Sequence, residues 1–104
     1  MIQAKFFESK GKLKGFSISG HSGYDEIGHD IVCASVSSAV QLTANTITEG
    51  FGVKAEVSVI GDNIRLELSQ PNRNAEVMLD MLKLHIELIS EDFPQTIKIN
   101  ITEV

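Results

Sequence analysis

The sequence is poor in cysteine, tryptophan, proline and basic residues, and these shortages exclude several classes of protein. One of the 104 residues is cysteine, two are proline and none is tryptophan. A single cysteine cannot form an internal disulfide, so the chain is not a disulfide-stapled secreted domain. Nine Lys and Arg against fourteen Asp and Glu give a formal charge of −5, which argues against nucleic-acid binding and permits a basic partner.

Long apolar segments are also expected to be missing. No segment approaches the ~20 apolar residues that a membrane-crossing helix needs, and residues 1–8 lack the apolar stretch of a signal peptide. We therefore expect a soluble, cytoplasmic protein without membrane contact. The length and the 42% hydrophobic content fit one globular domain over residues 1–104.

The first part of the chain has the pattern of a β-hairpin followed by a loop. Apolar and polar residues alternate over 2–8 and again over 12–19, which predicts two strands joined through residues 9–11. Residues 20–29 contain three glycines and no apolar period, which predicts a loop longer than the usual connection.

A helix is predicted directly after this loop. Asp30 is a suitable N-cap, the helix runs from Ile31 to Glu49, and Gly50 suits the left-handed position that ends many helices. Small residues allow close packing on most sides of this helix. Its apolar stripe is expected to be buried and consists of Val32, Val36, Val40 and Ile47.

The second part of the chain repeats the pattern. Apolar and polar residues alternate over 53–59 and 64–68 around a turn at 61–63, which predicts a second hairpin. A second helix is predicted to begin at 71–74 and to end at about Glu91, and a last strand is predicted over 97–101. The apolar face of the second helix is expected to comprise Met78, Met81, Leu82, Leu88 and Ile89, and its polar face Glu76, Asp80, Lys83 and Glu87. The prediction is a single α+β domain in the order strand-strand-helix-strand-strand-helix-strand, its sheet packed with a central helix that carries the cysteine.

Cys33 is the strongest candidate for chemistry. With Asp30 as the cap, Cys33 is the third helical residue, where free N–H groups and the helix dipole favour a thiolate. His21 and His29 are the nearby imidazoles that can take the proton of the thiol. The competing interpretation is a small buried hydrophobe, the usual role of a free cysteine. The negative charge of Asp30 also opposes thiolate formation. On chemistry alone, the buried interpretation is favoured.

Other candidates are weaker. A metal held by His29 and Cys33, four residues apart, with further ligands from His21, Asp25 and Glu26, lacks the tight ligand pairs of structural zinc sites. His85 lies within the apolar arc of the second helix and is interpreted as a core or interface histidine. Ser37, one turn after Cys33, either faces the same site or bonds back to the carbonyl of residue 33.

Two motifs together resemble a known family. Gly20-His21-Ser22, followed by the run Asp30-Ile31-Val32-Cys33-Ala34-Ser35-Val36-Ser37, is similar to the ribosomal-processing cysteine protease family, Prp, of Firmicutes and related bacteria. The resemblance extends in length and element order over essentially the whole chain. It implies that Cys33 is the nucleophile and His21 its base, with Gly20, Asp30 and Ser37 around them.

The resemblance also implies a function. Family members are small α+β homodimers that remove a short N-terminal extension from the large-subunit ribosomal protein numbered twenty-seven, cutting after an aromatic pair. The expected protein is a cysteine endopeptidase that needs no cofactor or metal, with amides near Val32 and Cys33 stabilising the oxyanion. The alternative is a noncatalytic ribosome-assembly adaptor that binds the same basic protein through an acidic surface.

Overall fold

The predicted order of strands and helices is confirmed. The computed structural model describes residues 1–20 and 29–104, with the side chains of residues 29 and 30 outside that description. The elements are β1 (Ile2–Ser9), β2 (Lys12–Ser19), α1 (His29–Asn45), the π-helical turn η1 (Thr46–Gly50), β3 (Ala55–Ile60), β4 (Asn63–Leu68), α2 (Arg73–Asp92) and β5 (Ile97–Glu103).

Two hairpins and one returning strand build a five-stranded sheet in the order β3-β4-β2-β1-β5. Lys10 and Gly11 both have positive φ, as a tight two-residue hairpin turn requires, and they join β1 to β2. β4 then pairs antiparallel with β2, and β5 pairs parallel with β1. A β-bulge in the first hairpin leaves Lys14 without a cross-strand partner on β1.

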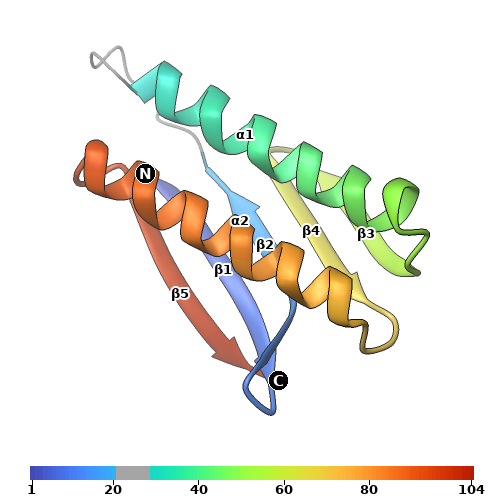
Figure 1. Ribbon diagram of the computed structural model, residues 1–104. Helices are drawn as coiled ribbons and strands as arrows, with labels where there is room; N and C mark the ends of the chain where they lie inside the picture. The colour runs from blue at the N-terminus through green and yellow to red at the C-terminus, as the bar shows by residue number, and fades with distance from the viewer. Residues whose placement is uncertain (21–28) are drawn as a thin grey trace.

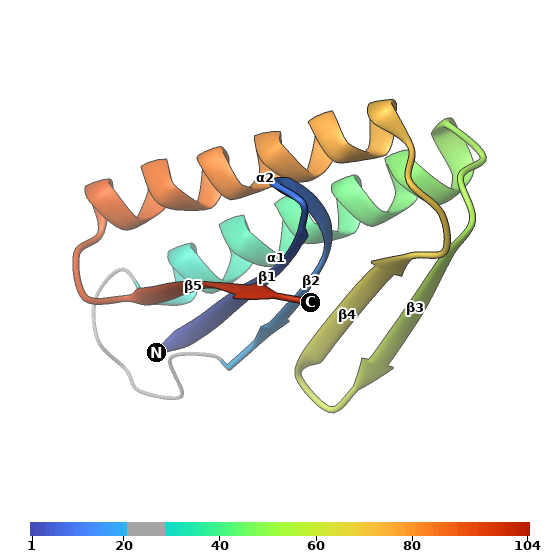
Figure 2. The same ribbon diagram turned by 90° about the horizontal axis from the view of Figure 1, so that it is seen from below.

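Both helices lie on the same face of the sheet, side by side (Figures 1 and 2). The core therefore forms between one helical layer and the alternate strand residues that point towards it. The predicted stripe of α1 and η1 is confirmed, because each of its four members is at most 3% exposed. The buried core residues include Ile2, Ala4, Phe6, Phe16, Ile18 and Leu66 from the sheet, and Val32, Val36, Val40, Ile47, Leu79, Leu82 and Ile86 from the helices.

The ends of the first helix differ from the prediction. α1 begins at His29, so Asp30 is inside the first turn and is not the N-cap. At the other end the chain continues through η1, and the left-handed residue is Gly52, with φ +66°, and not Gly50. The extra π-helical turn moves the helix stop two residues downstream.

The expectation about apolar segments was wrong by one measure. Ile31–Gly50 reaches a mean hydropathy of 1.2, which satisfies the length and composition test for a membrane span. Its Val and Ile stripe, however, is buried against the sheet of the same domain. The core helix of a globular domain passes the same test, so composition alone is weak evidence for a span.

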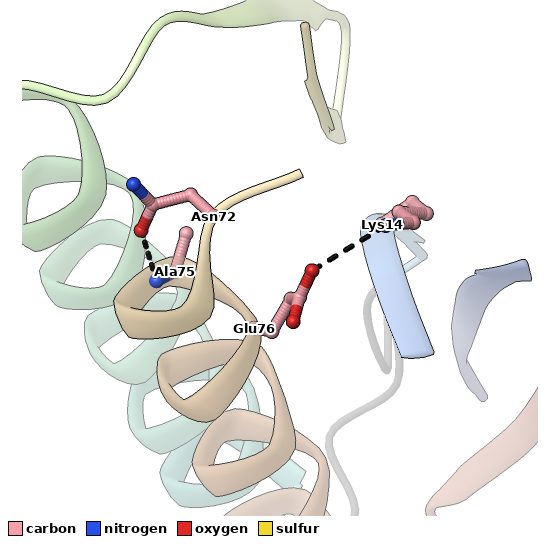
Figure 3. Close-up of polar contacts among 4 residues, drawn as sticks. All are labelled: Lys14, Asn72, Ala75 and Glu76. Atoms are coloured by element: carbon pink, nitrogen blue, oxygen red, sulfur yellow. Dashed lines mark hydrogen bonds and ion pairs between the residues drawn. The ribbon is translucent and has the colours of Figure 1, made fainter. Parts of the chain in front are cut away.

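The face that α2 turns to the sheet also differs from the prediction. The helix begins after Asn72, whose side-chain oxygen accepts a hydrogen bond from the amide of Ala75 at 3.0 Å (Figure 3). Its buried residues are Ala75, Glu76, Leu79, Leu82 and Ile86. Met81 and Leu88, expected on the apolar face, are half exposed, and Glu76, expected on the polar face, is buried. α2 is apolar around more than half of its circumference, so periodicity did not identify its inner face.

Glu76 is tolerated in the core because a lysine reaches it. The Nζ atom of Lys14 lies 3.4 Å from the Oε2 atom of Glu76, whose side chain is 5% exposed (Figure 3). Lys14 is the bulged residue of β2, so the bulge supplies the charge that compensates a buried carboxylate. The ion pair therefore links the first turn of α2 to the sheet.

We expect Lys14→Met to lower the free energy of unfolding by about 1–3 kcal/mol, because it leaves a buried carboxylate without its cation. Denaturant unfolding measures this. The matched control is Lys83→Met, which removes the more exposed Lys83–Glu87 pair and should change stability by about 0.5 kcal/mol or less. The double variant Lys14→Met/Glu76→Met should recover most of the loss, and equal stability of Lys14→Met and Lys83→Met would contradict the assignment.

Candidate active site

Cys33 projects from α1 into a groove of about 320 Å³ between that helix and the β3–β4 hairpin. Cys33 is half-buried and packs against the hydrophobic core, so the interpretation as a buried hydrophobe holds only in part, and the residue also borders the groove. We call this space the Cys33 groove. It is lined by Ile2, Ile18, Gly20, Cys33, Val36, Ser37, Val40, Val59, Gly61, Asp62 and Ile64.

The position of Cys33 in its helix differs from the prediction. Because α1 begins at His29, Cys33 is its fifth residue, not its third. In a regular helix the amides of the fourth and fifth residues already donate to carbonyls one turn earlier. By this rule the amide of Cys33 donates within the helix, so the assignment of amides near Val32 and Cys33 as oxyanion donors stays a prediction. Cys33 also lies beyond the first turn, where the helix dipole acts most strongly.

Gly20 lines the groove, and two features of its surroundings explain why it is glycine. Its φ is +89°, a region that side chains disfavour, and a Cβ atom there would lie 2.7 Å from the carbonyl oxygen of Met1. Any larger residue would shift the end of β2 or the start of β1. The chain therefore leaves β2 in a fixed direction at the residue before His21.

Of the five site residues predicted from the sequence, the structure brings three together. Gly20, Cys33 and Ser37 line one groove, and the Oγ atom of Ser37 accepts a hydrogen bond from the Nε2 atom of Gln41 at 3.1 Å. Ser37 thus faces the same site as Cys33, one of its two predicted roles. His21 lies outside the described residues. Asp30 is described only as a backbone position in α1, so its place beside Cys33 and His21, which the resemblance implies, stays a prediction.

The far wall of the groove was missed by the sequence analysis. Val59 and Ile64 come from facing strands of the second hairpin, and Gly61 and Asp62 form its turn. The sequence signal for these residues was a hairpin turn, which predicts local structure only. Their place beside Cys33 results from the pairing of β4 with β2, and no local pattern encodes that neighbour.

The other histidines and the metal alternative give no second centre in the described part of the chain. His85 is exposed, so its interpretation as a core histidine is wrong. It lines a separate groove between α1 and α2, away from the thiol. Among the side chains that the structure describes, in residues 1–20 and 31–104, no three His, Cys, Asp or Glu gather as a metal site. Of the predicted ligands, His21, residues 25–26 and the side chain of His29 fall outside that description.

Comparison with known proteins supplies the context for this groove. The family model described as cysteine protease Prp matches residues 1–98. The ribosomal processing cysteine protease Prp of Bacillus subtilis is 24% identical over 107 residues, covering 95% of this chain and 96% of that protein.

Two crystal structures of the essential ribosomal processing protease Prp of S. aureus are similar in fold. The complex with a substrate peptide has a TM-score of 0.89 at 22% identity, and the complex with a covalently linked product peptide has a TM-score of 0.87 at 24% identity. Both alignments cover 98% of this chain and 100% of the other.

Proposed function

Because this chain belongs to the cysteine protease Prp family, we propose that it removes the short N-terminal extension of the large-subunit ribosomal protein numbered twenty-seven, using Cys33 and His21 as a catalytic dyad. The observation that carries the proposal is the half-buried thiol of Cys33 in an open groove. A thiol there is reachable by an extended peptide. The proposed site of action is the cytoplasm.

In the proposed reaction His21 takes the proton of the Cys33 thiol, and the thiolate attacks the scissile carbonyl carbon. The tetrahedral intermediate breaks its C–N bond, His21 returns the proton to the leaving amine, and a thioester links the acyl part to Cys33. Water activated by His21 then attacks the thioester, which releases the carboxylate product and restores the thiol. The thiolate is itself the nucleophile, so this sequence uses no cofactor.

The test is incubation of the chain with the extended ribosomal protein, followed by mass spectrometry. Protease activity yields two fragments, with the cut after the aromatic pair of the extension. An intact but bound ribosomal protein would reject the proposed reaction and favour the adaptor, for which the formal charge of −5 suits a basic partner.

We also propose that the protein is a homodimer that buries the groove between its two helices. This α1–α2 groove has a volume of about 590 Å³ and is flanked by Leu42, Met81, Leu84 and Leu88, which are 46–63% exposed. Such a cluster of large apolar side chains is typical of a contact surface, and a two-fold dimer can cover it with a copy of itself.

In light scattering at micromolar concentration, the wild type should have twice the 11.4 kDa mass of one chain. Leu84→Glu should shift it towards one chain, because a charge in an apolar interface loses its hydration. Ile101→Glu on β5 is the matched control, since Ile101 is 50% exposed but lies outside this groove. A wild type that stays at 11.4 kDa would reject the dimer.

A further inference from the structure

One edge of the sheet is open beside the proposed active site. β3 is first in the strand order, and in the described part of the chain no strand pairs with its outer side. Its sequence, AEVSVI, carries one charge, and Val57 and Val59 are 46% and 67% exposed. Sheet edges are usually protected by charge, proline or a covering segment, because their unpaired main-chain groups recruit other strands. β3 has the composition of a strand that receives a partner.

The turn of the second hairpin determines which main-chain groups face outward. Gly61, at φ +60°, is the first residue of a two-residue turn that closes on the pair Ile60 and Asn63. In a hairpin with a two-residue turn, the two residues that flank the turn donate to and accept from each other through their main-chain N–H and C=O groups. Along an antiparallel ladder such hydrogen-bonded pairs alternate with pairs that make no hydrogen bond to each other. Ile60 and Ser58 therefore bond to β4, and the N–H and C=O groups of Val57 and Val59 point to the open edge.

The side chains of the same two residues point towards the helical layer. Val57 lies opposite the fully buried Leu66, and Val59 lies opposite Ile64. Both Val59 and Ile64 line the Cys33 groove. The open edge and the thiol thus share one apolar wall. β5, the other edge strand, is at the opposite end of the sheet and contributes no residue to this groove.

From this continuity we propose that the substrate binds as an additional strand on the outer edge of β3. Its main chain bonds to Val57 and Val59, and its alternate side chains turn into the Cys33 groove over Val59 and Ile64. The inference rests on the proposed protease function and identifies how the peptide is held in register. When a peptide binds as an added strand, main-chain hydrogen bonds provide the affinity, and the pockets that receive its alternate side chains provide the selectivity.

The test uses the wild-type protein and a series of substrate peptides, each N-methylated at one amide away from the scissile bond. Strand addition predicts that KM rises about 2–10-fold at every second amide and stays near the unmodified value in between, because only alternate amides face β3. A flat or uniform response overturns the inference. If the unmodified peptide is not cleaved at all, the proposed function has failed instead.

Variants of β3 give an independent measurement. Val57→Pro removes the outward N–H and keeps the ladder to β4, a position where edge strands accept proline. It should raise KM by about 2–10-fold with little change in kcat. The control Ser58→Thr changes a residue of the same strand whose main-chain groups bond to β4, and it should behave as wild type. Equal KM for the two variants, with both folded by circular dichroism, would contradict strand addition.

Discussion

Cys33→Ala is expected to lower peptide cleavage by at least about 10³-fold while the protein still folds and binds its substrate. The reaction needs the thiolate as its nucleophile, and the remaining groups of a protease supply only part of the rate enhancement when the nucleophile is removed. The thiol is half-buried at the groove surface, so its loss leaves no large cavity in the core. Mass spectrometry measures cleavage and fluorescence anisotropy measures peptide binding.

Ala34→Ser provides the matched control for this variant. It changes the neighbouring, exposed residue of α1, which does not line the groove, and it should retain the wild-type rate. Cys33 is the only cysteine in the chain, so alkylation of the wild type by iodoacetamide modifies one thiol and should stop cleavage as well. Cleavage by Cys33→Ala at the wild-type rate would contradict the assignment of Cys33 as the nucleophile.

His21→Ala should lower the single-turnover cleavage rate by about 10²-fold or more, the usual cost of losing a general base. His29→Ala should keep much of its activity. For His85→Ala, any loss should follow reduced stability or dimerisation, because this histidine lines the α1–α2 groove and not the Cys33 groove. Melting curves for all three variants separate a chemical defect from unfolding. If His21→Ala is active and a folded His29→Ala is inactive, the general base is His29 and not His21.

Local patterns were sufficient to predict most of the fold. The two-residue alternation of the strands and the turn residues Lys10-Gly11 and Gly61-Asp62 specify the hairpins without reference to the rest of the chain. The buried stripe of α1 was equally clear, because valine recurs on one side of a helix whose other sides are mostly small or polar.

Features that depend on distant contacts could not be predicted in the same way. Burial of Glu76 requires Lys14, which a bulge in a different element brings to it. The wall of the groove at Val59 and Ile64 depends on which strand β4 pairs with. For the candidate site, the sequence identified Cys33 and Ser37 on one side of a single helix, but their opposing wall is a product of tertiary structure.

The parallel pairing of β1 with β5 connects one side of the groove to the far end of the chain. Ile2 contributes to the groove, yet its amide donates to the carbonyl of Thr96 at 2.9 Å and it pairs with Ile97. Contacts between such distant parts of a chain form slowly, because closing a long loop costs conformational entropy before the new hydrogen bonds can form. The two hairpins need only local contacts, whereas the start of β1, where Ile2 lines the groove, gains its hydrogen bond to Thr96 only after the end of the chain has folded back onto it.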